Sequence, residues 1–589
     1  MDVYVNVVVD VDVYVNVVVD VHVHVGDRWW GEGGALCPER DRTSSVNVGA
    51  PGGPAKTAAN LARRAASSEA GRMRAALDRA GTTGELLTPR LDEIRRRPLF
   101  ALQGYSGLHR SCGDVYFPAS VEELRVLFRM ARRTGRRITF RAGGQSFDGQ
   151  ALNDDIVISM HHFRSIEIDT QGARMTVGAG ATWGAIARAL AAHGFVPYTV
   201  VSTSHATAGG TVSGDCLSRF SGIASKEGHY VERLSLLSLD GQLLSLSRDE
   251  ATSALFHAVI GGLGYLGAVI DVTYRVARVA PAGTPIRVVT QATRCASLEE
   301  LATALLPRAE QLLHAEGGTA DEDGWIPEAL FSIAFHTLEG SRSMVLRSRY
   351  VPGTSHELRP LLIHRPRHVL RVPIEWLMRA SVVSRGLWTL IDRFLFDVSR
   401  PYVDELMGYL FFMDGNVRAK RIAQTLGMPM LTVQQAFMIP YDPGAQEDSL
   451  RRLVDFLGKV DEIASRDGIP PLLLDVLHIQ GDQFLLSANH GTDGFAVTLA
   501  FEASEEESAH RIGLRLSELS ARALELGGRV YLVKNVHATA EHLQAMYAHA
   551  LPEFVRLKRL VDPDGLLRNE FLERVFPAHF GAAPRPASP

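Results

Sequence analysis

The sequence predicts an α+β protein with two domains, and three observations support this. With 589 residues, the chain is too long for one ordinary hydrophobic core. From Pro98 to Ala280, short β-like runs, amphipathic helices and glycine turns alternate at close spacing. From Pro281 to Gly528, β-like runs such as FSIAFHTLE and VQQAFMIP are mixed with long helices, as expected of an antiparallel sheet covered by helices.

The composition excludes several classes of protein. Apolar residues make up 46% of the chain and charged residues 22%, which is typical of a globular protein. The net charge of −4 gives no reason to expect a nucleic-acid partner. The four cysteines lie far apart and form no CxxC pair, so we expect reduced thiols, no metal site and no disulfide framework.

The N-terminus has an unusual repeat. The first 25 residues alternate Val with Asp, Tyr, Asn and His, and the block VYVNVVVDV occurs twice with a period of ten. These four residues share the NAC codon family, so a short DNA repeat with GTG for Val would translate in this way. We therefore expect that the start is assigned too early, with Met73 as the true start and no signal peptide. Residues 1–72 are expected to be low-complexity and disordered, and residues 578–589 to form a disordered tail.

Capping residues and periodicity predict the elements of the first domain. Ser120 precedes an apolar stripe with acids in its first turn, and Gly135 follows it, which predicts a helix between them. Thr182 and Gly194 bound a second helix in the same way. The expected strands are at 137–140, 155–160, 165–169 and 175–180, and an Asp-Gly pair at 240–241 predicts a hairpin turn.

Three glycine clusters punctuate this domain: TFRAGGQSFDGQ at 139–150, STSHATAGGTVSGD at 202–215 and IGGLGYLGAVIDVTYRV at 260–276. Adjacent glycines let several backbone N–H groups converge on one point, as a pyrophosphate requires. Gly264 and Gly267 would allow the backbone to approach a ligand closely. Taken singly, the first cluster is more typical of a plain tight turn.

In their order and spacing, the three clusters and the hairpin resemble the FAD-binding domain of the vanillyl-alcohol oxidase superfamily, the PCMH-type flavoprotein fold, over residues 98–280. The resemblance implies a two-subdomain FAD-binding fold. It also implies that residues 281–528 form a substrate or cap domain, whose antiparallel sheet roofs the flavin. Residues 529–577 are then expected to return to the FAD-binding domain.

The C-terminal segments GGRVYLVKNVHATAEHLQAMY and VDPDGLLRNEFLERVF are similar to one branch of this superfamily, the decaprenylphosphoryl-β-D-ribose 2-oxidase type. That branch carries a lysine after a YLxK strand, matched here by Tyr531 and Lys534, and the DPDG turn also matches. The similarity implies a flavoenzyme that acts on a sugar or sugar-like substrate.

The resemblance also implies which residues hold the cofactor. In the superfamily, the first cluster and the TAGG segment grip the pyrophosphate and the flavin, and the third cluster packs near the adenine side. The implied FAD-binding residues here are Arg141, Ala142, Gly143, Gly144, Gln145, Ser146, Phe147, Asp148, Gly149, Thr207, Ala208, Gly209, Gly210, Gly214, Asp215, Gly267, Ala268, Val269 and Tyr531.

Three positions depart from the relatives. Gln145 stands where many of them have a histidine joined to the flavin, and an amide is no nucleophile, so we expect non-covalent FAD. Phe147 replaces a tyrosine of the ribose oxidase branch, and Leu217 replaces a histidine near the flavin ring. His205 would compensate for that loss, or it is simply a histidine hydrogen-bonded within a loop.

The implied catalytic residues are Lys534, Gln434 and His478. A lysine beside the flavin would stabilise the negative charge that develops on reduction and would hold the substrate hydroxyl. Gln434 matches a pocket glutamine of the ribose oxidase branch, and His478 stands where that branch has a lysine. A histidine there would take the hydroxyl proton, although a chance histidine is the more ordinary reading.

The stretch 361–400 combines aromatic residues with several arginines, among them Arg365, Arg367, Arg371, Arg379, Arg385 and Arg393. Such a stretch would touch a membrane surface, or it forms helices that bury the aromatics and expose the arginines. No apolar window is long enough to span a bilayer outside the N-terminal repeat. The expected location is cytoplasmic, with peripheral contact at the inner face of the plasma membrane as the second reading.

The sequence thus predicts a two-domain FAD-dependent oxidoreductase that takes a hydride from a CH–OH group of a sugar, polyol or lipid-linked sugar. The alternatives are an aldonolactone oxidase, a flavin reductase of the sterol Δ24 type, and a flavin-binding protein that has lost turnover. The last is suggested by Leu217 and Phe147.

Overall fold

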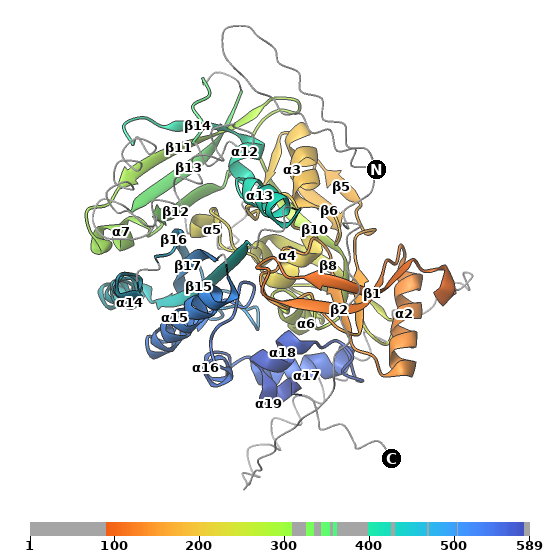
Figure 1. Ribbon diagram of the computed structural model, residues 1–589. Helices are drawn as coiled ribbons and strands as arrows, with labels where there is room; N and C mark the ends of the chain where they lie inside the picture. Colours follow the sequence, from red (N-terminus) through yellow and green to blue (C-terminus); the bar gives the residue numbers. More distant parts are fainter. Residues whose placement is uncertain are drawn as a thin grey trace.

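The computed structural model describes residues 90–308, 325–334, 343–353, 357–361, 398–425, 430–467, 470–503 and 505–581. Three sheets organise these residues (Figure 1). Two of them, of four and six strands, belong to the N-terminal domain, and the third has eight strands. Helices and sheets occupy separate layers, which agrees with the expected α+β class.

The four-stranded sheet has the order β1-β2-β4-β3, and β4 pairs in parallel with both of its neighbours. Helix α2 (Val121–Thr134) packs on it through Leu124, Leu127 and Phe128. Both expected caps of α2 are present, since Ser120 accepts the N–H of Glu123 and Gly135 adopts φ 62°. The strands are β1 (Arg96–Gln103), β2 (Arg110–Tyr116), β3 (Ile138–Arg141) and β4 (Ile156–Ser159), preceded by the 3-10 turn η1 (Leu91–Glu93).

The six-stranded sheet has the order β5-β6-β10-β8-β9, and β7 pairs with β10. The expected hairpin joins β8 to β9, and Gly241 in its turn has φ 92°. Its strands are β5 (Ile166–Asp169), β6 (Arg174–Gly178), β7 (Phe195–Pro197), β8 (Val231–Leu237), β9 (Leu243–Ser247) and β10 (Ala268–Arg278). Its helices are α3 (Trp183–Ala192), α4 (Ala208–Gly214), α5 (Ser221–Ala224), η2 (Glu227–Tyr230) and α6 (Ser253–Val259).

The eight-stranded sheet has the order β14-β11-β13-β12-β16-β17-β15-β18, and each of its strand pairs is antiparallel. Helices α14 and α15 cover its outer face (Figure 1). Its strands are β11 (Ile286–Arg294), β12 (Glu328–Ala334), β13 (Met344–Pro352), β14 (Tyr402–Glu405), β15 (Leu431–Tyr441), β16 (Leu473–Ile479), β17 (Asp493–Ala503) and β18 (Arg529–Val530). Its helices are α7 (Leu298–Ala304), α12 (Leu406–Leu410), α13 (Asp414–Thr425), η5 (Pro443–Ala445), α14 (Gln446–Asp467) and α15 (Glu506–Glu525).

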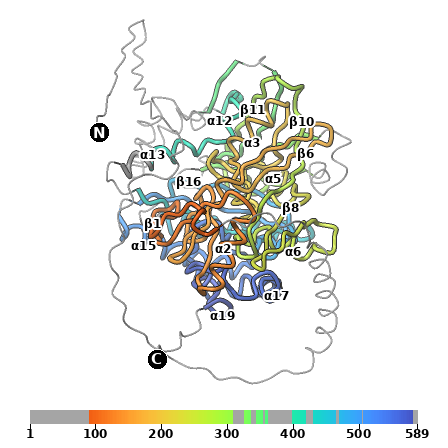
Figure 2. The backbone as a smooth tube through the Cα atoms, turned by 90° about the vertical axis from the view of Figure 1, so that its right-hand side faces the viewer, coloured from red at the N-terminus to blue at the C-terminus, as the bar shows by residue number. Residues whose placement is uncertain are grey.

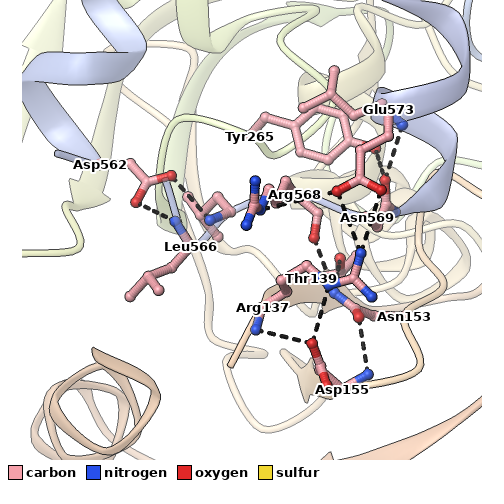
Figure 3. Close-up of polar contacts among 12 residues, drawn as sticks. Arg137, Thr139, Asn153, Asp155, Tyr265, Asp562, Leu566, Arg568, Asn569 and Glu573 are labelled. Carbon is pink, nitrogen blue, oxygen red and sulfur yellow. Dashed lines mark hydrogen bonds and ion pairs between the residues drawn. The ribbon is translucent and has the colours of Figure 1, made fainter. Parts of the chain in front are cut away.

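The C-terminal helices return to the N-terminal domain (Figures 1 and 2). They are α16 (Ala540–Met546), α17 (Leu551–Val561), α18 (Glu570–Val575) and α19 (Pro577–Phe580). Asn569 makes the central contact, because its side-chain amide donates to the carbonyls of Gly149, Gln150 and Leu152. Its side-chain oxygen accepts the hydroxyl of Tyr265, which lies beside it in Figure 3. The first glycine cluster is therefore held from behind by the end of the chain.

Some details differ from the expectations. Lys534 is not on a strand, because β18 ends at Val530 and the chain then bends. Helix α19 extends three residues into the tail expected at 578–589, of which 578–581 are described. Residues 1–72 and 582–589 lie outside the described residues. Cys216 and Cys295 are free thiols, whereas Cys112 is disulfide-bonded, so the expectation of reduced cysteines is wrong at Cys112. Among the described helices, none combines the length and apolarity that a bilayer crossing needs.

Candidate functional site

A cavity of about 350 Å³ lies where the glycine clusters face the inner side of the eight-stranded sheet. Residues 140–147, 200–220 and 263–269 contribute to its floor, and strands β12, β15, β16 and β17 contribute to its roof. Val533 and Lys534, together with helix α13, close its sides. The cavity therefore draws on both domains, which is where ligand sites usually form.

The first glycine cluster approaches other backbone too closely to carry side chains. A Cβ on Gly143 would lie 2.3 Å from the carbonyl oxygen of His205, so the first two clusters pack backbone to backbone. A Cβ on Gly144 would meet the guanidinium of Arg141 at 2.6 Å, and Gly144 has φ 62°. Arg141 donates to the carbonyl of Gln103 at 3.0 Å, and burial lowers its pKa to about 10. A positive charge is therefore fixed directly behind the loop.

The hydroxyls of Ser146 and Thr207, both in the cavity wall, have no partner in the part of the chain that the structure describes. The Oγ of Ser146 and the Oγ1 of Thr207 are buried, and neither makes a hydrogen bond with the described residues. Thr207 precedes helix α4 but does not cap it with its side chain. A buried hydroxyl without a partner costs free energy unless a ligand supplies one. Ser146 and Thr207 thus point to a ligand with acceptor oxygens.

The second cluster forms a helix instead of a loop. The N–H of Gly209 donates to the carbonyl of Ala179 at 2.9 Å, and a Cβ on Gly209 would lie 2.5 Å from the Cβ of Ala179. Gly210 and Gly214 also line the cavity. From the third cluster, Gly264, Gly267 and Val269 reach the cavity wall, whereas Ala268 is buried outside it.

Several predicted cofactor residues hold the site together without lining the cavity. Asp148 is buried and pairs with Arg574 at 2.7 Å and His109 at 3.0 Å, and it also accepts the N–H of Gly149. Although burial opposes it, the bond from His109 and the charge of Arg574 hold the pKa of the Asp148 carboxyl well below its usual range. Asp148 therefore joins the first cluster to the C-terminal helices.

A second buried network lies below helix α4. Asp215 pairs with the ammonium of Lys226, which also pairs with Asp482 at 2.9 Å. Tyr531 donates its hydroxyl to the carbonyls of Gly214 and Asp215 at 3.1 Å. Ala208 is likewise buried behind the cavity wall. These residues position α4 and do not face the cavity.

Lys534 and Gln434 lie together in the cavity wall. The ammonium of Lys534 is 4.6 Å from the centre of the Phe147 ring, and it has no hydrogen bond or ion pair to another described residue. Burial lowers its pKa, opposed by Cys216 and Asp475. The backbone of Gln434 exchanges hydrogen bonds with Asn535, which holds the Lys534 segment against β15.

His478 lies on the other face of the sheet. In β16 the side chains of Leu473, Asp475 and Leu477 reach the cavity, so the even-numbered His478 points toward the outer layer. Its ring packs against Tyr441 and Phe495, and burial lowers its pKa to about 4. Because alternate residues of a strand point to opposite faces, His478 does not line the cavity. His205 also lies outside the cavity lining.

Three charged residues in the cavity wall, Asp475, Arg219 and Glu502, were missed by the sequence reasoning. Asp475 presents an unpartnered Oδ1, and burial raises its pKa, opposed by a bond to Thr498 and by the charges of Lys534 and Arg219. The guanidinium carbon of Arg219 is 3.5 Å from the centre of the Phe412 ring, and burial lowers the pKa of Arg219. The alternation LLLDVLHI could have pointed to Asp475, because only one charge stands in that strand.

A family of FAD-binding domains matches residues 114–247. This match identifies residues 114–247 as an FAD-binding domain. The chain is 24% identical over 463 residues to the decaprenylphosphoryl-beta-D-ribose oxidase of Mycolicibacterium smegmatis, covering 77% of this chain and 92% of that protein. It is 22% identical over 497 residues to the L-gulonolactone oxidase of Bos taurus, covering 80% of this chain and 98% of the relative. The D-arabinono-1,4-lactone oxidase of Eremothecium gossypii is 29% identical over 185 residues, or 30% of this chain and 34% of the relative.

The residues of this flavoprotein fit the cofactor. FAD carries an anionic pyrophosphate, and the cavity offers the unpartnered hydroxyls of Ser146 and Thr207 beside the positive charge of Arg141. The glycines of the first two clusters leave the backbone open to a ligand. The protein is an FAD-dependent oxidoreductase, as the matched family and the relatives show.

Proposed function

We propose that the protein oxidises a CH–OH group of a sugar or sugar-like substrate, with the roof of the cavity as the substrate-binding face. When bound, FAD supplies the acceptor for the hydride that leaves the carbinol carbon. The observation that carries the proposal is that Lys534, Gln434 and Asp475 all line the cavity whose floor is formed by the glycine clusters.

Each of these side chains has a distinct task. Asp475 takes the hydroxyl proton, since its Oδ1 is unpartnered and its raised pKa suits proton transfer. Lys534 holds the hydroxyl oxygen as negative charge develops on it. Gln434 orients the substrate through its side-chain amide, which has no bond to another described residue. His478, on the opposite face, takes no part.

The rest of the roof supports a substrate with an apolar body. A free polyol or lactone would need a polar partner for most of its hydroxyls. The roof and the adjoining segment 410–417 instead present mainly apolar side chains to the cavity: Phe331, Ile333, Leu410, Phe412, Met413, Val417, Leu472, Leu473, Leu477, Ala500 and Phe501. This favours a lipid-linked sugar, the class named by the mycobacterial relative, over an aldonolactone.

The expected contact with a membrane would suit a lipid-linked substrate. Residues 362–397 of that stretch lie outside the described residues. Peripheral contact and a cytoplasmic location therefore stay predictions, as does the non-covalent attachment inferred from Gln145, whose amide donates to the carbonyl of Gly143 at 2.9 Å.

An anaerobic bleaching screen tests the proposal. The holoprotein is mixed without oxygen with polyols, aldonolactones, lipid-linked sugars and NADPH, and the loss of the yellow flavin band is followed. We expect bleaching by a lipid-linked sugar. Bleaching by lactones or polyols alone would favour the aldonolactone oxidase alternative, and bleaching by NADPH alone a reductase. No bleaching by any donor would favour a protein that binds flavin without turnover.

A further inference from the structure

A stack of two cations and two aromatic rings leads away from Lys534. Its ammonium lies 4.6 Å from the centre of the Phe147 ring, and that ring lies 4.9 Å from the ring of Tyr105 at 61°. The ammonium of Lys420 lies 4.6 Å from the centre of the Tyr105 ring. The stack thus runs Lys420, Tyr105, Phe147, Lys534, through residues from four separate segments.

The two rings are fixed by the backbone that carries them. The N–H of Tyr105 donates to the carbonyl of Ser146 at 2.8 Å, and the N–H of Ser106 donates to the carbonyl of Phe147 at 3.2 Å. A Cβ on Gly104 would lie 2.8 Å from the carbonyl oxygen of Asp148, so the turn packs directly on the first glycine cluster. A shift of Tyr105 therefore moves Phe147 and the cluster with it.

Lys420 fastens the far end of the stack. Its side chain is buried, and its ammonium donates to the carbonyl of Tyr105 and to the hydroxyl of Thr432 on β15. The N–H of Thr432 donates to the carbonyl of Ser106 at 2.9 Å, which ties the same turn to the eight-stranded sheet. Hydrogen bonds and the Tyr105 ring offset the free energy that burying this charge costs. Lys420 makes no ion pair with a described residue.

The surroundings of Lys420 shift the pKa of its ammonium group. Burial lowers its pKa to about 8, opposed by the charge of Glu502 on β17. On its own helix, Asp414 is engaged by the hydroxyls of Thr203 and Ser204, and that contact holds α13 against the second glycine cluster. Burial also raises the pKa of the Tyr105 hydroxyl to about 12, so Tyr105 stays neutral.

We propose that Lys420 is a positioning residue that sets the ammonium of Lys534 against the cofactor through Tyr105 and Phe147. No bond is made or broken by Lys420. Removing its charge frees the Tyr105 ring, loosens Phe147, and lets Lys534 leave the place where it faces the flavin. The inference rests on the proposed FAD site but not on the identity of the substrate.

Sulfite titration of the bound flavin tests this without a substrate. Sulfite adds to the flavin and bleaches it, and a nearby cation strengthens the adduct because the ring becomes negatively charged. We expect Lys534→Met to weaken sulfite binding by about tenfold or more. Lys420→Met should weaken it by about three- to tenfold, and Lys420→Arg should restore most of the loss. Lys459→Met on the surface of α14 is the matched control and should change nothing.

The double variant gives the decisive comparison. If Lys420 acts only through Lys534, Lys420→Met/Lys534→Met will bind sulfite as Lys534→Met does, within about twofold. Equal sulfite affinity in Lys420→Met and the unmodified protein overturns the proposal, as does an undiminished effect of Lys420→Met in the Lys534→Met background. Tyr105→Leu, which removes a ring but no charge, gives the same test if Lys420→Met does not fold. A normal sulfite pattern with no bleaching by any donor would refute the proposed oxidation and leave the role of Lys420 standing.

Discussion

Gly143→Ala is the sharpest single test of the cofactor site. The added Cβ would lie 2.3 Å from the carbonyl oxygen of His205, where ordinary contact needs about 3.4 Å. The oxygen is a backbone atom and the Cβ is fixed directly to the backbone of residue 143, so relief requires the first two glycine clusters to move apart by about 1 Å. Overpacking of this kind costs about 1–3 kcal/mol. If the strain falls on the FAD-binding loop, the Kd for FAD rises by about five- to 150-fold.

The assay is a fluorescence titration of apoprotein with FAD, with thermal unfolding measured in parallel. Gly458→Ala is the control, because Gly458 lies within helix α14 and a Cβ there would meet nothing within 4 Å. That change should raise stability by about 0.5–1 kcal/mol and leave the Kd unchanged. A Kd for Gly143→Ala within twofold of the unmodified protein, in a folded variant, would refute the placement of FAD against the two clusters.

Three further predictions concern single side chains. Ser146→Ala should stabilise the apoprotein slightly, because the buried Oγ has no partner among the described residues, and it should weaken FAD binding by about 1–3 kcal/mol. A less stable apoprotein with unchanged FAD affinity would contradict this prediction. Asp475→Asn should slow anaerobic bleaching by a productive donor about 100- to 10,000-fold while FAD content is retained, and an unchanged rate would exclude Asp475 as the base. Glu227 accepts hydrogen bonds from Tyr274 and Thr211, and burial raises its pKa from about 4.5 to about 8. Its contribution to the free energy of unfolding is therefore present below pH 4.5 and is lost as the pH rises to 8. Glu227→Gln should therefore remove a decline on the order of 3 kcal/mol between pH 4.5 and 7 in urea unfolding, and a decline of equal size in the variant would assign it to other groups.

The N-terminal domain could be predicted well because its signals are local. Ser120 and Gly135 cap α2 as expected, and the Asp240-Gly241 pair forms its hairpin. The glycines of the first two clusters also line the expected cavity, since only glycine permits such close approach of backbone. These features depend on a few adjacent residues.

The cavity roof could be predicted less well because it depends on long-range pairing. A shift of one residue in a strand exchanges the two faces, which is why His478 falls outside the cavity and Asp475 inside it. Lys534 was matched by motif, but its place over Phe147 depends on contacts with β15 that no local pattern encodes. Asp148 and Tyr531 were expected at the cofactor and instead brace the loops behind it.

The stoichiometry of released flavin tests the central claim most directly. The purified protein is denatured, the chain is removed by filtration, and the absorbance of the filtrate is recorded beside the mass of the chain. We predict that FAD appears in the filtrate in proportion to the protein and that the chain keeps the mass of its sequence, because Gln145 offers no covalent link. A colourless protein that also fails to take up added FAD would contradict the assignment of the cavity as an FAD site.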